Sequence, residues 1–449
     1  MLRRKIQKEI TDYLDNKSEK ILILDGARQI GKSFIIRHEG KKRFKNYIEI
    51  DLYEDKKGDR LFEGTRNKED FYLRLSTIAG DRLGEKSNTL VFLDEIQAYP
   101  DMLTLLKFLR QDDRFTYIVS GSQLGIALNE TLSKPGGRIK VVKMFQLDFE
   151  EFLWANGVGE EFIDHARQCF MQKVALDGPL HNRIMDLFKK YLLVGGLPDA
   201  VNKFVETYNI VEVRSAQKDV YELYKGDAIQ YDKERKLVIE RVYDLVPSYL
   251  ENKKKRVHFN QIENKKQARA WQYQAEFEYL VKSGICNEVK AVSNPKFPLV
   301  ESESKNLLKL YLNDVGLLTR LLYQYSISAI MNDEKSVNLG SVYESVVSSE
   351  LVAHGFPLYY YDNKKKGEVD FLVNDYDLLS VVPIEVKSGK DYSKHASLNT
   401  FVATPDYHIE QAFVLSNERE VTQDGKVTYL PVYYAMFFVP STPPDEVFV

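Results

Sequence analysis

Continuous apolar runs separated by helical stretches dominate the first third of the chain. A run without polar alternation is typical of a strand that is buried on both faces of a sheet. Four segments have this character: residues 21–25, 47–52, 90–93 and 117–119. Helical periodicity separates them around residues 70–83 and 102–110, and a short amphipathic helix is expected within residues 1–19. Strands that alternate with helices predict an α/β domain built on a parallel sheet.

The pattern changes at about residue 148, where helical segments take over as far as residue 231. The next region combines helices with strand-like segments at 285–292 and 307–312, separated by a turn signal at 293–296. The last region opens with a helix expected over 342–354. It continues with five strand-like segments, 357–361, 368–373, 381–386, 411–415 and 427–431. We therefore expect four regions: 1–147, 148–231, 232–335 and 336–449.

Composition narrows the class of protein without assigning a function. The length of 449 residues suggests about three domains. With 63 Lys+Arg against 66 Asp+Glu, the net charge of −3 excludes a uniformly basic nucleic-acid coat. The two cysteines, Cys169 and Cys286, lie far apart, which excludes a disulfide framework and suits a reducing compartment. No stretch approaches 18 uncharged apolar residues, so we expect a cytoplasmic protein without a membrane span.

A phosphate-binding loop follows the first predicted strand. The pattern G-x-x-x-x-G-K-[ST] is matched by Gly26, Ala27, Arg28, Gln29, Ile30, Gly31, Lys32 and Ser33. The glycines let backbone N–H groups curl around a triphosphate, and the start of the following helix adds positive potential. Lys32 would lie near the β- and γ-phosphates, and the Ser33 hydroxyl would bind Mg²⁺. We include Phe34, which opens the helix, among the ATP-binding residues.

The ends of the next strands supply the remaining groups that ATP hydrolysis needs. The strand at 90–93 ends in Asp94, expected to bind Mg²⁺ through water, and Glu95, placed to act as general base. After the strand at 117–119, Ser120 or Ser122 could hydrogen-bond the γ-phosphate or the attacking water, since the carboxyl ends of parallel strands face the ligand crevice. Arg138 could reach a phosphate in its own chain or in a neighbouring subunit of a homo-oligomer, although a solvated loop position is an equally good interpretation.

Together these motifs resemble an AAA-family ATPase of bacteria and archaea. The residues that carry the resemblance are Gly26 to Ser33, Leu93-Asp94-Glu95-Ile96-Gln97, Ser120-Gly121-Ser122, Gly137-Arg138, Val194-Gly195-Gly196-Leu197-Pro198 and Tyr311-Leu312-Asn313-Asp314-Val315-Gly316-Leu317. In that group the ATPase is fused to a C-terminal domain of uncertain role. The resemblance covers essentially the whole chain. It implies an AAA-type core, a helical lid-like region, a winged-helix-like module and a nuclease-like end.

A basic segment precedes the strand pair of the third region. Its cations are Lys253, Lys254, Lys255, Arg256, Lys265 and Lys266. The expected order of helix, helix, strand, turn and strand looks like a winged helix, in which one helix can enter a DNA major groove. The lysines would then contact phosphates in a salt-sensitive way. A solvated charged face on an interdomain module is the alternative interpretation.

A second group of carboxylates lies near the C-terminus. Because side chains alternate along a strand, Glu385 and Lys387 share one face, and Asp370 can converge with Glu385 on a divalent cation if their strands pair. Lys387 would orient a water or stabilise charge at an attacked phosphate, and Glu344 on the preceding helix could add a ligand. This arrangement resembles the PD-(D/E)xK nuclease fold, with Val369 where that pattern has proline.

The leading hypothesis is a Mg²⁺-dependent ATPase coupled to a nuclease-like domain that acts on DNA. Asp370, Glu385 and Lys387 are the candidate catalytic residues of that domain. Two alternatives stay open: a slow ATP-operated switch that recruits a partner, and a DNA-binding regulator built on the winged helix. The seven histidines form no HxxxH or HExxH pair, so the sequence gives no reason to expect a zinc site.

Overall fold

The structure is a computed structural model. It describes residues 1–16, 18–124, 137–231, 235–251, 255, 257–263, 268–332, 334, 337, 339–389, 393 and 395–441. The chain forms two compact units, described separately below. The first comprises Met1, Arg3–Phe145 and Lys282–Ile285, and the second Leu2, Gln146–Val281 and Cys286–Val449. The expected boundary after residue 147 lies two residues beyond the division at residue 145.

A five-stranded parallel sheet with the order β2-β3-β4-β1-β5 forms the centre of the first unit. Its strands are β1 (Ile21–Asp25), β2 (Asn46–Asp51), β3 (Thr89–Asp94), β4 (Thr116–Gly121) and β5 (Ile139–Lys143). Its helices are α1 (Ile6–Asp15), α2 (Lys32–Arg43), α3 (Leu52–Lys57), α4 (Lys68–Ala79), α5 (Asp101–Asp112) and the short η1 (Gly80–Arg82), η2 (Lys86–Asn88) and η3 (Ile96–Ala98). The predicted α/β fold with a parallel core is confirmed.

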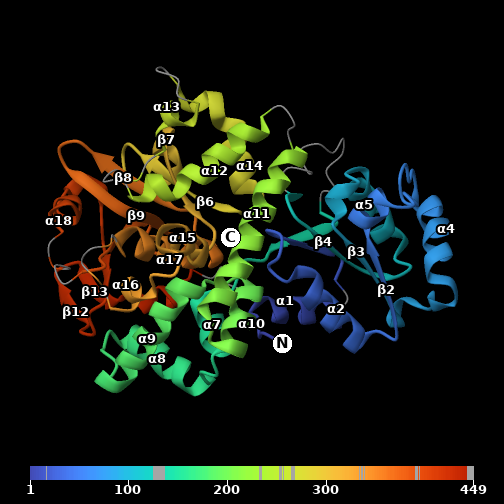
Figure 1. Cartoon of the computed structure of the whole chain (residues 1–449), viewed down its shortest axis with the longest axis horizontal. Coiled ribbons are helices and arrows are strands. Elements are labelled where there is room, and N and C mark those ends of the chain that lie inside the picture. The colour runs from blue at the N-terminus through green and yellow to red at the C-terminus, as the bar shows by residue number, and fades with distance from the viewer. Residues whose placement is uncertain are drawn as a thin grey trace, which may run out of the picture. The chain divides into compact units, whose positions relative to one another are not determined.

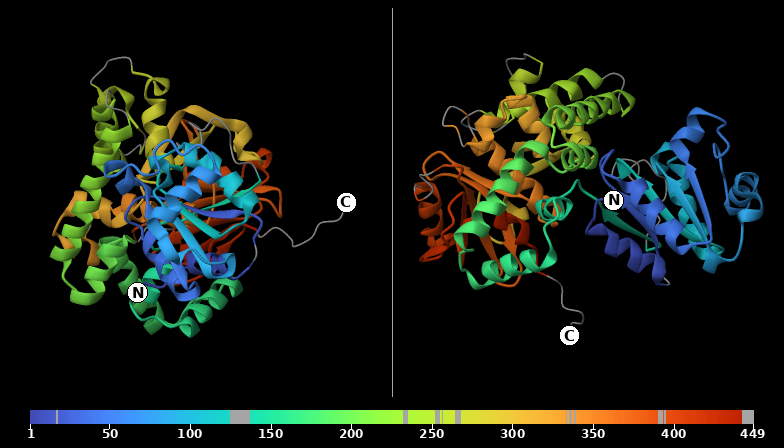
Figure 2. Two further views of the ribbon diagram at one scale, coloured as in Figure 1. Left: turned by 90° about the vertical axis from the view of Figure 1, so that its right-hand side faces the viewer. Right: turned by 60° about the horizontal axis from the view of Figure 1, so that its bottom comes forward.

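Burial on both faces explains the apolar runs of this sheet. Ile23, Val91 and Val119 pack on one face against α4 and α5, in a core that includes Phe71 and Leu106. Figure 1 shows α1 and α2 on one side of the sheet and α5 on the other, and Figure 2 shows the same layers from two further sides. Every residue of β1 and β3 is buried, as their uninterrupted hydrophobicity predicts.

The second unit begins with a series of helices. They are α7 (Phe149–Ala155), α8 (Glu160–Gln172), α9 (Gly178–Val194), α10 (Pro198–Thr207), α11 (Ile210–Tyr231), α12 (Lys236–Glu251), α13 (Phe259–Ile262), η4 (Ala270–Tyr273) and α14 (Gln274–Lys282). The Asp148 side chain starts α7 through a capping box with Glu151, and Asp177 caps α9 by accepting from Leu180 N at 2.9 Å. None of the described helices combines the length and apolar character that a bilayer crossing requires.

An eight-stranded mixed sheet completes the second unit, in the order β12-β13-β11-β10-β9-β8-β6-β7. Its strands are β6 (Cys286–Val292), β7 (Glu303–Leu312), β8 (Tyr359–Asn363), β9 (Gly367–Asp375), β10 (Ser380–Val386), β11 (Ala412–Ser416), β12 (Thr422–Asp424) and β13 (Val427–Pro431). The accompanying helices are α15 (Val315–Tyr323), α16 (Ile327–Met331), α17 (Leu339–Ala353), α18 (Ala396–Val402), η5 (Leu299–Ser302), η6 (Pro405–Tyr407) and η7 (Val432–Phe437).

The sheet crosses the boundary that was expected at residues 335/336. The strand pair β6 and β7, expected as the wing of a separate module, extends the sheet because β6 pairs in parallel with β8. From α17 onward the order is helix, three antiparallel strands, helix α18 and strand β11, which lies parallel to β10. The regions 232–335 and 336–449 therefore contribute strands to one sheet.

Two of the sequence motifs, at residues 194–198 and 311–317, meet inside the second unit. The Asp314 carboxylate caps α15 by accepting from Leu317 N at 3.0 Å, and it accepts from Gly196 N at 2.6 Å. Leu147 N in turn donates to Gly196 O at 2.7 Å. Burial raises the pKa of Asp314 to about 6, although these backbone N–H groups favour its charged form. Both motifs thus serve one buried junction.

Candidate functional site

The phosphate-binding loop joins β1 to α2. Its backbone takes the left-handed conformation at Gln29 and at Gly31, where φ is 94° and α2 begins. A Cβ atom at Gly26 would lie 2.2 Å from Met144 O, so this position requires glycine. The loop therefore presents the amino end of α2 to the carboxyl edge of the sheet, which is the arrangement that binds phosphates.

Lys32 is turned into this loop and is almost fully buried. Its ammonium group donates to Gly26 O at 3.0 Å and to Ala27 O at 2.7 Å. Burial lowers the pKa of Lys32, against the opposing attraction of Glu95 and Asp94. Burying this ammonium group costs free energy, and a phosphate bound at the loop would offset that cost by pairing with it.

Asp94 stands at the end of β3, next to the loop. It accepts a hydrogen bond from the hydroxyl of Ser120 on β4. Burial raises the pKa of Asp94, and the hydroxyls of Ser120 and of Ser33 on α2 counteract that rise. The predicted pair of magnesium ligands, Ser33 and Asp94, therefore lies close enough to interact, and oxygen atoms of this kind suit Mg²⁺.

Glu95 is held by a small hydrogen-bond network beside Asp94. Its backbone is left-handed, with φ of 52°, and its carboxylate accepts from Ser122 Oγ at 3.1 Å and from the Gln97 amide. Gln97 also donates to Ser122 Oγ at 2.9 Å and accepts from Ser122 N at 3.2 Å. The structure thus brings together Glu95 and Ser122, two of the predicted catalytic residues, through a third side chain.

The other predicted nucleotide-binding residues have different surroundings. Ile30 is fully buried, Phe34 is exposed, and the Arg28 guanidinium lies 5.2 Å from the centre of the Tyr53 ring. Arg138 is exposed and precedes β5, so it lies at the amino edge of the sheet, opposite the loop. Within one chain this position separates Arg138 from the phosphates, so a solvated loop position and contact with a neighbouring subunit are the two interpretations that remain. Pro135 and Gly136 lie outside the described residues.

The C-terminal carboxylates converge as the strand register requires. Strands β9 and β10 pair, and Asp370 Oδ2 accepts from Val386 N at 2.9 Å. Lys387 Nζ donates to Glu385 Oε1 at 2.6 Å. The buried Glu385 Oε2 has no hydrogen-bond partner among the described residues. Burial and then the negative charge of Asp370 raise the pKa of Glu385 to about 8.

Glu344 on α17 belongs to the same cluster. Its carboxylate accepts from Tyr311 OH at 3.0 Å and pairs with the ammonium group of Lys255. Burial and the charge of Asp370 raise the pKa of Glu344, while Lys255 and Lys309 act in the opposite direction. Lys309 is itself fully buried, and its Nζ lies 2.5 Å from Glu368 Oε1.

The pairing of Lys255 corrects one expectation for the basic segment. Lys255 was predicted to face solvent or a DNA phosphate, but its side chain is only 17% exposed and enters the carboxylate cluster. Lys253, Lys254, Arg256, Lys265 and Lys266 lie outside the described residues.

Residues 18–153 match a family model described as an AAA domain. Together with the five-stranded parallel sheet, this match shows that the N-terminal unit has the fold of a P-loop AAA ATPase. Two further models, each described as a domain of unknown function, match residues 185–327 and 339–435. A search of curated proteins finds no match.

Several solved structures are similar to this chain at low identity. A Walker-type ATPase of Pyrococcus abyssi is 16% identical, with 72% of this chain and 96% of that chain covered and a TM-score of 0.42. The ORC1 protein of Aeropyrum pernix in complex with DNA is 12% identical, with coverages of 73% and 92% and a TM-score of 0.31. An ADP complex of Hsp104 from S. cerevisiae is 14% identical, with coverages of 62% and 37% and a TM-score of 0.29.

Some residues of these sites had no role in the sequence-based prediction. In the AAA domain, Arg4 is buried and donates to Ile30 O at 3.0 Å, which holds the phosphate-binding loop from outside the motif. Gln97 was noted only as part of the resemblance. In the C-terminal cluster, Lys309 and Tyr311 come from β7, a strand that local pattern places far from Asp370.

Proposed function

We propose that the AAA domain binds ATP with Mg²⁺ and hydrolyses it at the carboxyl edge of its sheet. The observation that carries this proposal is the buried Lys32 turned into the phosphate-binding loop, with Asp94 and Ser33 close beside it. Magnesium, when bound, would supply positive charge that neutralises charge developing on the phosphate oxygens. Ser33 and Asp94 would hold the ion, and Lys32 would exchange its carbonyl contacts for phosphate oxygens.

Glu95 is the proposed general base for the attacking water. Gln97 and Ser122 hold its carboxylate in one orientation, so the base is positioned before the nucleotide arrives. Ser122 is hydrogen-bonded to both Glu95 and Gln97. A γ-phosphate that engaged either side chain would therefore change how the Glu95 carboxylate is held. Loss of the contact with Gln97 or with Ser122 would change the orientation of the Glu95 carboxylate.

The test of this proposal is ATP binding by Lys32→Ala. We expect calorimetry to show no ATP binding at millimolar nucleotide, because the phosphates lose their buried cation. Lys42→Ala is the matched control, since Lys42 lies on the same helix α2 and is exposed. Wild-type affinity in Lys32→Ala would refute the assignment of this loop.

For the second unit we propose a divalent-cation site that cleaves nucleic-acid phosphodiesters. The convergence of Asp370, Glu385 and Lys387 on paired strands, with Glu344 on the helix before them, supports it. The buried Glu385 Oε2 is an acceptor that a cation would satisfy. Asp370 and Glu385 would hold the ion, and Lys387 would stabilise charge at the attacked phosphate.

Nicking of plasmid DNA with Mg²⁺ or Mn²⁺ tests this second proposal. We expect Lys387→Ala to abolish nicking and Lys364→Ala, an exposed lysine in the same unit, to retain it. Nicking that survives Lys387→Ala would contradict the assignment of cleavage to this site, and absence of nicking by the wild type on DNA and RNA substrates would contradict cleavage.

The steady-state ATPase rate with and without DNA separates the proposed uses of ATP. Strong stimulation by DNA supports coupling between the two units, whereas a slow and indifferent rate supports the switch. Sequence-specific band shifts would favour the DNA-binding regulator. An arginine contributed by a neighbouring subunit predicts that Arg138→Ala lowers turnover only at concentrations where light scattering detects an oligomer.

A further inference from the structure

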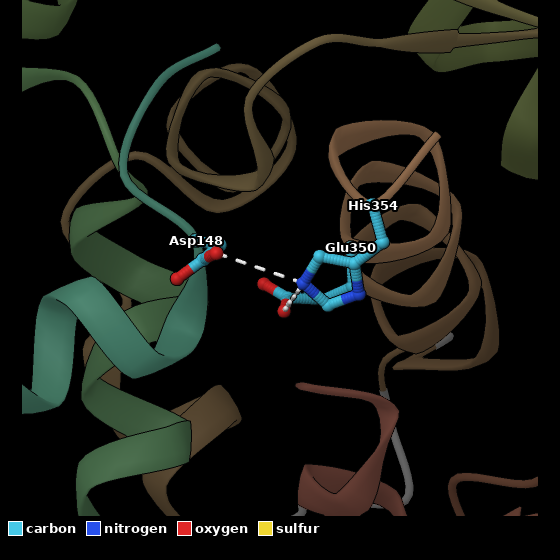
Figure 3. Close-up of side chains that lie close together, drawn as sticks. All are labelled: Asp148, Glu350 and His354. Carbon is cyan, nitrogen blue, oxygen red and sulfur yellow. Dashed lines mark ion pairs between the residues drawn. The ribbon is translucent and has the colours of Figure 1, made fainter. Parts of the chain in front are cut away.

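Three ligand-type side chains converge inside the second unit, away from both sites described above. Asp148 caps α7, Glu350 lies in the last turn of α17 (Leu339–Ala353), and His354 directly follows the end of that helix. His354 Nε2 lies 3.6 Å from Asp148 Oδ2 and 3.9 Å from Glu350 Oε2 (Figure 3). One ligand atom from each residue lies within 4.8 Å of the other two, and all three side chains are almost completely buried.

Backbone groups hold the opposite atom of each side chain. Glu151 N donates to Asp148 Oδ1 at 2.9 Å, and Phe149 N donates to Glu350 Oε1 at 2.7 Å. His354 Nδ1 lies 2.7 Å from Phe438 O. Each residue is thus oriented from behind while its other atom faces the shared point, which is how metal-binding side chains are supported in proteins.

The hydrogen bond to Phe438 decides the tautomer of His354. A carbonyl oxygen only accepts, so Nδ1 must carry the proton, and in the neutral ring Nε2 is an acceptor. Nε2 therefore faces the acceptor oxygens of Asp148 and Glu350. A proton on Nε2 would not bridge them, because 3.6 Å and 3.9 Å exceed hydrogen-bond length.

Two buried carboxylates beside an imidazole nitrogen form a donor set that suits a divalent cation, because a doubly charged ion would match the charge of both carboxylates. The pKa of Tyr191 reflects the negative charge of this region. Burial raises it first, and the charges of Glu350, Asp314 and Asp148 raise it further. The surroundings of the cluster therefore attract positive charge.

We propose that Asp148, Glu350 and His354 bind a divalent first-row transition metal, with Zn²⁺ the best fit. Imidazole selects such metals over Mg²⁺ and Ca²⁺. Bonds of about 2.1 Å in a tetrahedral site separate ligand atoms by about 3.4 Å. The two separations from His354, 3.6 Å and 3.9 Å, exceed this value by up to about half an ångström, and the oxygens of Asp148 and Glu350 lie within 4.8 Å of each other. Water would take the fourth position.

The role of this metal is structural. It would connect the start of α7 to α17, which His354 Nδ1 also joins to the segment at Phe438. These contacts link residues about 200 positions apart in the sequence, where a cross-link constrains the unfolded chain strongly. The same helix α17 carries Glu344, so the metal would also fix the helix that serves the carboxylate cluster.

Metal analysis of the full chain, purified without chelators, tests the proposal. We expect one equivalent of transition metal by mass spectrometry in the wild type. After chelation and dialysis, titration with Co²⁺ should give a saturable visible ligand-field band, and Zn²⁺ should displace it. Removal of the metal should lower the melting temperature by about 5 °C or more.

Variants assign the metal to these residues. His354→Gln and Glu350→Gln should lose the equivalent, with Zn²⁺ affinity at least about 100-fold weaker. His408→Gln, at an exposed histidine, should keep it, and so should Glu385→Gln, which separates this site from the proposed nuclease centre. If neither ligand variant folds, the wild-type metal content and Co²⁺ spectrum decide. The proposal is overturned if the wild type binds no Co²⁺ or Zn²⁺, or if Glu385→Gln removes the metal.

Discussion

The tightest backbone approach in the second unit predicts a large effect for the smallest possible side chain. In Gly196→Ala, the new Cβ atom would lie 1.9 Å from Leu147 O and 2.8 Å from two further Leu147 backbone atoms. A Cβ atom essentially never lies within 3.0 Å of a non-bonded heavy atom, so the two segments must separate by about 1.1 Å. No side-chain rotation can relieve this overlap, because every atom involved belongs to the backbone.

The magnitude follows from the hydrogen bonds that this separation breaks. Leu147 N donates to Gly196 O at 2.7 Å, and Gly196 N donates to Asp314 at 2.6 Å. A separation of about 1.1 Å takes the bond between Leu147 N and Gly196 O beyond hydrogen-bond length and leaves a buried donor unsatisfied, at about 1–3 kcal/mol. If Gly196 is the residue that moves, its bond to Asp314 is weakened or lost as well, at a similar cost. Alanine also restricts the unfolded chain, which stabilises the folded state by less than about 1 kcal/mol. We therefore expect the free energy of unfolding to fall by about 1–5 kcal/mol.

Urea unfolding followed by tryptophan fluorescence measures this change, because both tryptophans, Trp154 and Trp271, belong to the second unit. The matched control is Gly226→Ala, within helix α11, where a Cβ meets no atom within 4 Å. That variant should stabilise the unit by about 0.5–1 kcal/mol, since glycine weakens a helix. Equal unfolding midpoints for Gly196→Ala and the wild type would refute the reasoning.

Three further predictions concern the two proposed sites. Glu95→Gln should lower kcat for ATP about 100-fold or more while calorimetric ATP affinity stays unchanged, and wild-type turnover would assign the base elsewhere. Gly26→Ala should weaken ATP binding more than tenfold, because its Cβ would lie 2.2 Å from Met144 O; unchanged affinity in the same calorimetry would contradict this steric argument. Mn²⁺ affinity at the C-terminal cluster, measured by electron paramagnetic resonance, should rise about tenfold per pH unit and level off at about pH 8, because the ion must displace the proton that Glu385 holds below its raised pKa. A flat pH profile would exclude Glu385 as a ligand.

The parallel core could be predicted because its central strands β1, β3 and β4 are buried on both faces. Uninterrupted apolar runs identified β1, β2, β3 and β4 to within a few residues. The fifth strand, β5, was missed since it lies at the sheet edge, where Lys140 is exposed and the remaining residues are exposed or half-buried. An edge strand of this composition has no periodicity that separates it from a loop.

The ATP site could be predicted as far as its residues follow strand ends. Asp94, Glu95 and Ser122 lie together because adjacent parallel strands end at one edge of the sheet. The part of Gln97 depends on the left-handed turn at Glu95, which returns the chain toward Ser122. Residue identity does not specify that turn, so the network was not predicted.

The C-terminal site shows a different limit. The alternation rule placed Glu385 and Lys387 on one face, and their contact agrees with it. Lys255 and Tyr311 entered the site only because β6 and β7 join the sheet beside β8. Strand order over such distances is a tertiary choice that no local pattern encodes. His354 was likewise not predicted as a metal ligand, because its partners in the cluster are carboxylates and not a second histidine.

The continuity of the eight-stranded sheet governs how this protein can be dissected. A fragment that starts at residue 336 would lack β6 and β7, and the backbone of β8 would become a bare edge. Bare edges recruit strands from other molecules, so such a fragment would aggregate and would also be missing Tyr311, the hydroxyl that contacts Glu344. Biochemistry on the C-terminal chemistry in isolation must keep Cys286 to Pro431 intact.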